Sequence, residues 1–244
     1  MLTFCFHEKL QLVGKEKEER RIISNVWVVT GGTKGLGWQL SKHLLQKYST
    51  NVILIARRQP IDNVAREIKQ FGERVQVLLA DVSNKNQILA VFNQIAQQYN
   101  SISIIHSAGI ADDVLIQSQN IHRFGRVFEA KCKGLLNLKR AAQQYNIKID
   151  NWILNSSVSS TLGNVGQSNY AAANAFLDAF ARLHPNACSI NWANWTETGF
   201  ASSSSITDVL RKKGFYGLKT DEALECFDWI LSHRSVDQIL CCTS

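Results

Sequence analysis

The sequence lacks the cysteine patterns of metal-binding and disulfide-stabilised proteins. Its six cysteines are scattered along the chain, with no Cys-x-x-Cys pair and no regular spacing. This distribution predicts no metal site and no disulfide framework, and it is typical of reduced thiols in a cytoplasmic protein. We expect the adjacent Cys241 and Cys242 to fill the interior of a strand.

Long apolar runs and clustered basic residues are also missing. No stretch approaches the roughly 18 apolar residues of a membrane span, and His7, Glu8 and Lys9 interrupt the N-terminus too early for a secretory signal. The formal charge is +7, but the 27 lysines and arginines are spread along the chain. We therefore expect no membrane and no nucleic acid as partner. The charge suits an anionic cofactor or a phosphate-bearing carrier protein.

Short apolar runs alternate with segments of helical periodicity. Residues 36–48 and 85–99 have the period of helices, and the apolar runs read as buried strands at 25–30, 51–56, 74–80, 102–108, 151–157, 187–193 and 237–242. This alternation predicts an α/β fold in a single domain, a Rossmann-type doubly wound parallel sheet of about seven strands with helices on both faces.

Two segments fall outside the alternation. Residues 1–24 contain the charge run at 15–21, which favours a solvated helix or linker, and we expect a charged extension or the remnant of a structural half-domain there. Residues 196–219 form a long interruption rich in serine and glycine after the sixth predicted strand, and this position favours a lid.

A glycine-rich loop, VTGGTKGLG at 29–37, joins the first predicted strand to the first predicted helix. Such a loop lets the backbone approach a pyrophosphate, which the N-terminus of the following helix binds. The strand and helix on either side are what the dinucleotide motif requires, so an ordinary glycine turn is the weaker interpretation. For the lysine of this loop, a solvent-facing side chain is an equal alternative to a phosphate contact. The expected cofactor contacts are Thr30, Gly31, Gly32, Thr33, Lys34, Gly35, Leu36 and Gly37.

The second predicted strand ends without an acidic residue. An acid at this point selects NAD, whereas an arginine accommodates the 2′-phosphate of NADP. Arg57 and Arg58 therefore predict NADPH, with two ordinary surface arginines as the alternative. Later strand ends supply further expected cofactor contacts, namely Asp81 and Val82 after the third strand and Ser107, Ala108 and Gly109 after the fourth.

Tyr170 and Asn174 stand four residues apart in a predicted helix and share one face of it. A tyrosine that donates a proton at neutral pH needs a nearby positive charge, because its free pKa is about 10. Asparagine supplies no charge. Spacing alone leaves Lys131, Lys133 and Lys139 as candidate cations, and it leaves open a buried tyrosine without catalytic function.

The motifs TGGTKGLG, ADV, HSAG and the block at 155–181 together resemble the short-chain dehydrogenase/reductase superfamily. Within it, residues 25–242 resemble the ketoreductase domains of polyketide synthases and animal-type fatty acid synthases. The resemblance implies an NADP-binding ketoreductase catalytic domain at 25–244. In this branch the catalytic lysine comes from the preceding long helix, and the match at 124–138 selects Lys131.

The resemblance implies four catalytic residues. Tyr170 donates a proton to the substrate carbonyl oxygen while the nicotinamide delivers a hydride to the carbon. Ser157, at the family's spacing before this tyrosine, hydrogen-bonds the same oxygen. Lys131 lowers the tyrosine pKa, and Asn174 holds the lysine or a relay water.

Further residues match positions that control the substrate. Asp112 and Asp113 match the aspartates of the family's Leu-Asp-Asp motif, although Ala111 replaces its leucine. Leu162 stands where ketoreductases of the opposite stereochemical type carry tryptophan, so the resemblance implies the D-alcohol. Other expected contacts of the substrate or the nicotinamide are Gln167, Trp192, Asn194 and Trp195.

The resemblance implies NADPH-dependent reduction of a β-ketoacyl thioester to the β-hydroxyacyl thioester in polyketide or fatty acid synthesis. The partners it implies are an acyl carrier protein, other synthase domains or a separate structural half-domain, since full ketoreductase units carry a degenerate half before the catalytic half. Two alternatives stay open, a stand-alone short-chain reductase of small free ketones and an inactive NADP-binding structural module. The complete Lys-Ser-Tyr-Asn set disfavours the inactive module.

Overall fold

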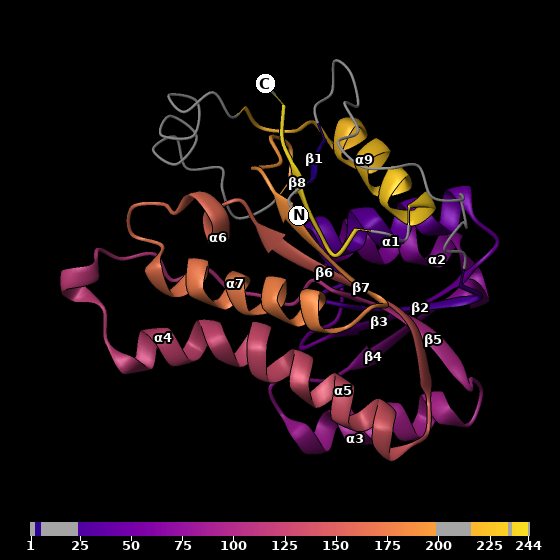
Figure 1. The fold of residues 1–244 in the computed structure, drawn as a ribbon. Coiled ribbons are helices and arrows are strands. Elements are labelled where there is room, and N and C mark those ends of the chain that lie inside the picture. Colours follow the sequence, from indigo (N-terminus) through magenta and orange to yellow (C-terminus); the bar gives the residue numbers. More distant parts are fainter. Residues whose placement is uncertain (1–2, 6–23, 199–215, 234–235, 244) are drawn as a thin grey trace. The chain divides into compact units, whose positions relative to one another are not determined.

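The computed structural model describes residues 3–5, 24–198, 216–233 and 236–243 (Figure 1). No helix in these ranges is both long enough and apolar enough to cross a membrane. The strands are β1 (Thr3–Cys5), β2 (Val26–Thr30), β3 (Asn51–Ala56), β4 (Val75–Leu79), β5 (Ser101–His106), β6 (Lys148–Ser157), β7 (Ala187–Trp192) and β8 (Gln238–Cys241). The helices are α1 (Gly35–Lys47), α2 (Asp62–Gln70), α3 (Lys85–Ala96), α4 (Ile121–Phe128), α5 (Gly134–Gln144), α6 (Ser159–Leu162), α7 (Ser168–Leu183) and α9 (Thr220–Ser232). The described residues also form three short helical turns, η1 (Gly72–Arg74), η2 (Ile116–Ser118) and the π-helix η3 (Glu129–Lys133).

The strands form one parallel, Rossmann-like sheet with flanking helices, in the order β1-β8-β7-β6-β5-β2-β3-β4. All seven predicted strands are present, which confirms the predicted fold class. The structure adds the short β1, which pairs with β8 in the register Thr3 to Ile239. This strand lies in the stretch 1–24, which the sequence predicted to be a charged extension or the remnant of a structural half-domain. The charge run at 15–21 lies outside the described residues.

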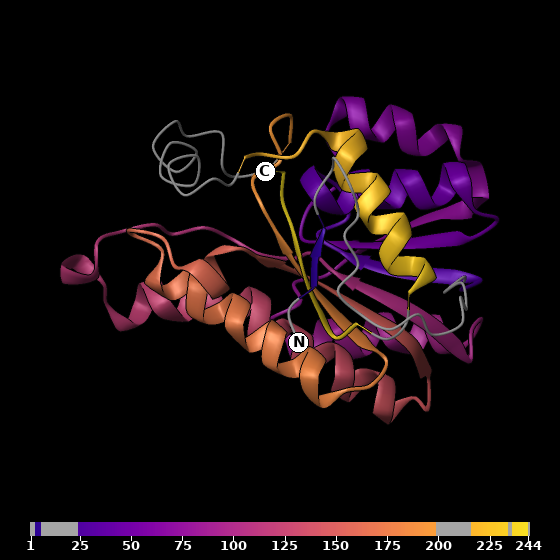
Figure 2. The ribbon, with the colours of Figure 1, turned by 45° about the horizontal axis from the view of Figure 1, so that its top comes forward.

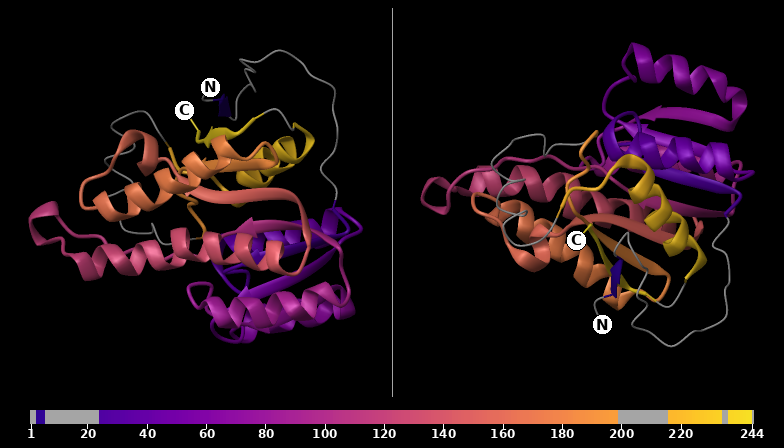
Figure 3. Two further views of the ribbon diagram at one scale, coloured as in Figure 1. Left: turned by 60° about the horizontal axis from the view of Figure 1, so that its bottom comes forward. Right: turned by 90° about the horizontal axis from the view of Figure 1, so that it is seen from above.

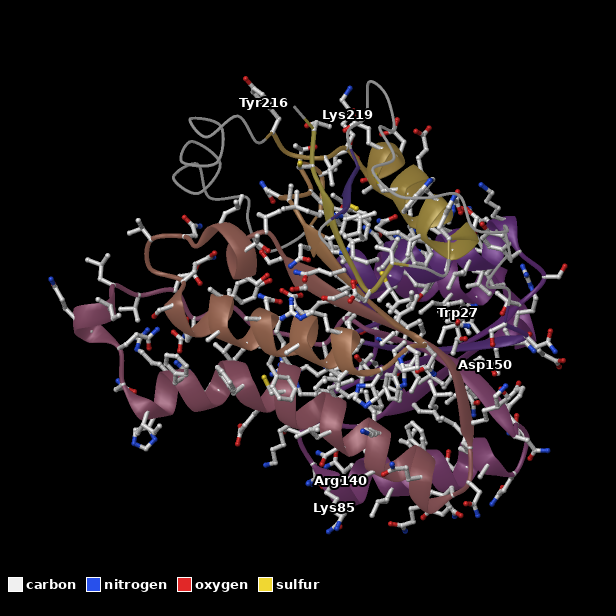
Figure 4. All side chains as sticks on the ribbon, viewed as in Figure 1. Trp27, Lys85, Arg140, Asp150, Tyr216 and Lys219 are labelled. Carbon is white, nitrogen blue, oxygen red and sulfur yellow. The ribbon has the colours of Figure 1, made fainter. Side chains whose placement is uncertain are left out.

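The apolar runs form strands because helices bury both faces of a parallel sheet. Every residue of β2 is buried, and so are the four central residues of β3. Figure 4 shows Trp27 of β2 within the sheet layer, whereas Lys85 and Arg140 point outward from α3 and α5. The side chain of Trp27 is 1% exposed, so even the largest residue of the strand belongs to the core.

The chain divides into two compact units. Unit 1 takes in β1, Ala111–Phe124 and Leu154–Ser244, and unit 2 takes in Ile23–Ile110 and Gly125–Ile153. Strand β6 contributes residues to both. In unit 2, α1 and α2 lie on one side of β2, β3 and β4, and α3 packs on α5 on the other side (Figures 1 and 2).

Residues 125–144 of unit 2 form one uninterrupted helical run (Figure 3). The end of α4, the π-helix η3 and α5 follow one another in it without a break. A π-helical turn inside an α-helix widens the backbone locally and occurs frequently at functional sites. In this chain the turn carries Lys131.

In unit 1, α7 packs against β7 and α6 (Figure 1). The two ends of the segment predicted as a lid lie side by side. Trp195 forms a β-bridge with Leu218, and the Thr196 N–H donates to the Leu218 carbonyl at 2.9 Å. Residues 199–215, the greater part of the predicted lid, lie outside the described residues.

Candidate active site

The predicted site residues divide between the two units. Unit 2 holds the glycine-rich loop, the other expected cofactor contacts and Lys131, and unit 1 holds Ser157, Tyr170, Asn174 and the predicted substrate positions. Each set is built by its own local structure.

The N-terminus of α1 in unit 2 has the features of a phosphate-binding helix end. Its N-cap residue, Lys34, makes no side-chain capping hydrogen bond, and no acidic residue lies in the first turn. The first N–H groups of a helix have no partner within the helix and carry the positive end of its dipole. Lys34 is exposed, as the alternative interpretation of this lysine expected, whereas Gly32 and Thr33 are buried.

Two glycines give this loop its form. Gly35 has φ +53° and no atom within 4 Å of the place where a Cβ would stand, so the backbone is open to a ligand there. At Gly37 a Cβ would stand 2.5 Å from the Gly31 carbonyl oxygen, which makes glycine necessary for the close turn. The open, uncapped helix end therefore fits the pyrophosphate of a dinucleotide.

The residues that follow strands β3 and β4 differ in how accessible their side chains are to a ligand. Arg57 and Arg58 are exposed after β3. Asp81 accepts hydrogen bonds from the N–H and the hydroxyl of Ser83 at 2.8 and 2.7 Å, so one of its carboxylate oxygens holds the turn after β4. Val82 is buried, and its carbonyl accepts from Asn137 at 2.9 Å.

A buried hydrogen-bond chain links the ends of β2 and β5 to η3. The Thr30 hydroxyl lies 2.8 Å from Nδ1 of His106, and Nε2 of His106 lies 2.9 Å from the Lys131 carbonyl oxygen. The same hydroxyl accepts from the N–H groups of Ser107 and Ala108 at 3.2 and 3.1 Å. Thr30 is fully buried, so its side chain supports the predicted cofactor turn from within.

The structure distinguishes the three candidate lysines. Lys131 is only 4% exposed, and its side chain runs beside Gly109, where a Cβ would meet its Cε at 3.1 Å. Lys133 is exposed and pairs loosely with Glu129 at 3.9 Å, and Lys139 is half-buried. Burial of a lysine against the Ser107–Gly109 turn agrees with the choice made by the family resemblance.

In unit 1, α7 carries Tyr170 and Asn174. Nδ2 of Asn174 donates to the Tyr170 carbonyl at 2.9 Å, and the Tyr170 N–H donates to Oδ1 of Asn169 at 2.8 Å. Asn174 is fully buried, and its Oδ1 has no hydrogen-bond partner among the described residues. A buried acceptor without a partner is costly, so this oxygen is available to a donor such as an ammonium group or a water.

The surroundings of Tyr170 within unit 1 make its hydroxyl a weaker acid. Burial raises the pKa of Tyr170, a hydrogen bond with Asn174 lowers it, and the Asp113 carboxylate raises it. None of these three effects comes from a cation. The requirement for a positive charge, deduced from the sequence, therefore stands.

Ser157, the last residue of β6, is held by its neighbours. Its Oγ accepts from the N–H and the hydroxyl of Ser159 at 3.2 and 3.0 Å, which leaves the Ser157 proton for an outside acceptor. Its carbonyl accepts from Ser160 and Asn191 at 2.9 and 3.2 Å. Asp178 binds the same two side chains at 2.6 and 3.0 Å and so anchors the turn to α7.

The Asp112–Asp113 segment is fastened to the residues before Tyr170. Gln167 donates to the Asp113 carboxylate at 2.8 Å, and Asn169 donates to the Asp112 carbonyl at 3.0 Å. Arg123 pairs with the Asp112 carboxylate at 2.7 Å. The structure thus brings together both predicted aspartates and the predicted glutamine.

Other predicted substrate positions differ in exposure. Leu162 ends α6 and is half-buried. Trp192 and Trp195 are 4% and 3% exposed, and their rings contact each other edge to face. Trp192 also donates to Asn155 at 3.1 Å, so both indoles belong to the core of unit 1. Asn194, which lies between these two tryptophans, is partly accessible.

Sequence reasoning missed three residues that organise the site, His106, Asn169 and Arg123. Each of the three bonds to a residue distant in the sequence: His106 to Lys131, and both Asn169 and Arg123 to Asp112. Asn169 also accepts from the N–H of its neighbour Tyr170. A polar residue ending an apolar strand was the available signal for His106, and the asparagine next to Tyr170 was the signal for Asn169.

Comparison with known proteins gives the family. The family model described as the KR domain matches residues 25–197. The chain is 31% identical over 209 residues to polyketide synthase GfsA of Streptomyces halstedii, covering 82% of this chain and 3% of that protein. It is 32% identical over 240 residues to polyketide synthase PksL of Bacillus subtilis, covering 88% of this chain and 5% of that protein. The chain thus spans a small part of these relatives, which are large polyketide synthases.

Solved structures agree with the sequence comparison. An A-type ketoreductase from a modular polyketide synthase superposes with a TM-score of 0.81 at 26% identity, covering 93% of this chain and 48% of that one. A ketoreductase domain from the bacillaene assembly line gives 0.76 at 28% identity, covering 88% and 55%. The domains of this family are oxidoreductases that bind a nicotinamide cofactor. The chain belongs to the ketoreductase domain family of the polyketide synthases, within the short-chain dehydrogenase/reductase superfamily.

Proposed function

We propose that this chain uses NADPH to reduce the β-keto group of an acyl thioester carried by an acyl carrier protein. The observation that carries this proposal is the burial of Lys131 against the Ser107–Gly109 turn. Burying an ammonium group is costly unless a nearby group uses the charge. Tyr170 is the group in this chain whose predicted chemistry requires that charge.

In this proposal the glycine-rich loop and the Ser107–Gly109 turn would hold NADPH, which when bound would supply the hydride for the carbonyl carbon. Tyr170 gives its phenolic proton to the carbonyl oxygen, so that the ketone becomes an alcohol. Ser157 donates its free hydroxyl proton to the same oxygen and stabilises the charge that develops on it. Lys131 stabilises the tyrosinate that remains. Oδ1 of Asn174, which has no hydrogen-bond partner in the part of the chain that the structure describes, accepts from the lysine or from a water that restores the proton.

The preference for NADPH rests on the end of β3. Arg57 and Arg58 are exposed there, and no acidic residue stands among the first five residues after the strand. A guanidinium binds the 2′-phosphate, whereas a carboxylate would bind the ribose hydroxyl of NAD. The uncapped N-terminus of α1 supplies the pyrophosphate site in either case.

The carrier-bound substrate and the D-alcohol rest on the relatives and on the Asp112–Asp113 segment. The relatives named above are polyketide synthases, whose assembly makes other synthase domains or chains the natural partners. Gln167 and Asn169 hold this segment beside the start of α7, and the Asp113 carboxylate acts electrostatically on Tyr170. Leu162 in place of a tryptophan agrees with the same stereochemistry.

The test is the loss of absorbance of NADPH, and separately of NADH, with a short β-ketoacyl pantetheine thioester as substrate. We expect turnover with NADPH, a large loss in Tyr170→Phe of about 100-fold or more, and the D-alcohol as product by chiral chromatography. Tight NADPH binding without turnover would contradict the proposal and favour the inactive module. Turnover of small free ketones at equal kcat/KM would contradict the carrier-bound substrate.

A further inference from the structure

His106 is a fully buried histidine that the proposed chemistry does not use. It ends β5 and bonds on one side to Thr30, the last residue of β2, and on the other to the backbone of η3. These three elements carry the glycine-rich loop, the Ser107–Gly109 turn and Lys131. The imidazole therefore links, by hydrogen bonds within unit 2, the strand that leads into the glycine-rich loop and the helical turn that carries Lys131.

The protons of this chain of hydrogen bonds have defined positions. A carbonyl oxygen only accepts, so Nε2 of His106 donates to the Lys131 carbonyl. Nδ1 of the neutral ring then accepts from the Thr30 hydroxyl. The Thr30 oxygen accepts in turn from the N–H groups of Ser107 and Ala108. Each nitrogen of the imidazole has a hydrogen-bond partner, and the direction of each bond follows from that of the next.

The ring stays neutral at physiological pH. Burial lowers the pKa of His106 to about 4, and the hydrogen bonds to the backbone of Lys131 and Ala130 oppose this only in part. The charge of Lys131 lowers the pKa further. A histidine locked in one neutral tautomer is a fixed spacer, not a proton donor or acceptor.

Lys131 is consequently held at two points. The His106 ring holds its carbonyl, and its side-chain stem lies against Gly109, at the end of the turn that Thr30 fixes. Lys131 lies in the π-helical turn, where the backbone hydrogen bonds span one residue more than in the α-helices before and after it. Together these contacts set the distance between the lysine and the turn that the cofactor is expected to touch.

We propose that His106 is a positioning residue, which sets the place of the Lys131 ammonium relative to the Ser107–Gly109 turn. This inference rests on the proposed function, in which that ammonium supplies the positive charge for Tyr170. The effect of a charge on a neighbouring group falls with distance, so a small displacement of Lys131 weakens the effect. The role of His106 is thus distinct from binding substrate or cofactor.

Two substitutions at His106 test this role. His106→Phe keeps a ring of similar size but removes both hydrogen bonds, and His106→Gln keeps an N–H donor for the Lys131 carbonyl. The matched control is Ser103→Ala on the same strand. The fully buried Ser103 hydroxyl accepts from Asn151 at 2.9 Å, and within the described ranges it makes no hydrogen bond to a predicted site residue. Thermal unfolding and NADPH titration of each variant report its folding.

We expect His106→Phe to lower kcat by about tenfold or more while the KM for the thioester and the Kd for NADPH change by less than about threefold. The alkaline limb of the kcat profile for reduction, where Tyr170 loses its proton, should move to higher pH because the ammonium lies further away. Asp113, the other charged group that acts on Tyr170, is the same in every variant. His106→Gln should restore most of kcat and the position of the limb, and Ser103→Ala should change only the unfolding temperature.

Three results would overturn the positioning role of His106. The first is an unmoved alkaline limb with an unchanged kcat in folded His106→Phe, which would leave the proposed function intact. A shift in Ser103→Ala equal to that in His106→Phe would reduce the effect to general destabilisation and would also overturn it. Absence of turnover in the unaltered chain would overturn the proposed function, and the positioning role with it.

Discussion

The surroundings of Tyr170 oppose the acidity that its predicted chemistry requires. Burial and the Asp113 carboxylate both raise the pKa of the phenol, and the hydrogen bond with Asn174 lowers it. A tyrosine in such surroundings stays protonated but transfers its proton poorly. Proton transfer from Tyr170 therefore depends on the positive charge of Lys131 and on the residues that hold this lysine in place.

Arg57 carries the proposed choice between NADPH and NADH. We expect Arg57→Asp to weaken NADPH binding by about tenfold or more, because a carboxylate repels the 2′-phosphate, and to improve NADH binding relative to NADPH. Fluorescence titration with the two cofactors measures both affinities. Arg58→Asp is the matched control for the change of charge, and an equal loss in the two variants would contradict a specific contact with Arg57.

The turn from β2 into α1 depends on close backbone packing at Gly37. Gly37→Ala places a Cβ 2.5 Å from the Gly31 carbonyl oxygen, and we expect a loss of about 1–3 kcal/mol in the free energy of unfolding. The NADPH affinity should fall as well, because the phosphate-binding turn must open to accept the methyl group. Urea unfolding monitored by circular dichroism gives the first quantity, and cofactor titration gives the second.

A second helical glycine serves as the control. Gly125 in α4 has no atom within 4 Å of its Cβ position, so Gly125→Ala should raise the free energy of unfolding by about 0.5–1 kcal/mol through better helix propensity. Destabilisation by both substitutions to the same extent would show that the loss at Gly37 does not come from the tight turn.

The sheet and its order of elements were predictable because parallel strands are apolar along their whole length and helices are not. The run at 51–56 matches β3 to the residue. The three-residue β1 has too short a pattern, and its place depends on pairing with β8 at the other end of the chain. The π-helical turn changes the hydrogen-bond register without changing the hydrophobic pattern, so no periodicity marks it.

The candidate site was predictable as far as motifs reach. Tyr170 and the glycine-rich loop were singled out from local spacing, whereas the choice of Ser157 and of Lys131 needed the family resemblance. The bond between Thr30 and His106 joins residues 76 positions apart, and the bond between Gln167 and Asp113 joins residues 54 positions apart. Such pairs arise only when the fold brings distant segments of the chain together, and a single sequence contains no record of them.

The buried His106 also makes the stability of the folded chain depend on pH. The folded pKa of His106, about 4, lies below the ordinary value of 6.5. Between these two pH values the imidazole binds a proton in the unfolded chain and stays neutral in the folded chain. The stabilisation is complete above pH 6.5 and is lost as the pH falls towards 4. The shift corresponds to about 3 kcal/mol of unfolding free energy lost across that window.

Urea unfolding of the unaltered chain and of His106→Gln at intervals from pH 7.5 to pH 4 isolates this contribution, since glutamine does not titrate. We expect the two stability curves to converge as the pH falls, because only the histidine loses stabilisation from protonation of the unfolded state. Parallel curves would mean that His106 has an ordinary pKa in the folded chain. Its ring would then take up a proton near neutral pH, and it could not serve as the fixed neutral bridge between Thr30 and Lys131.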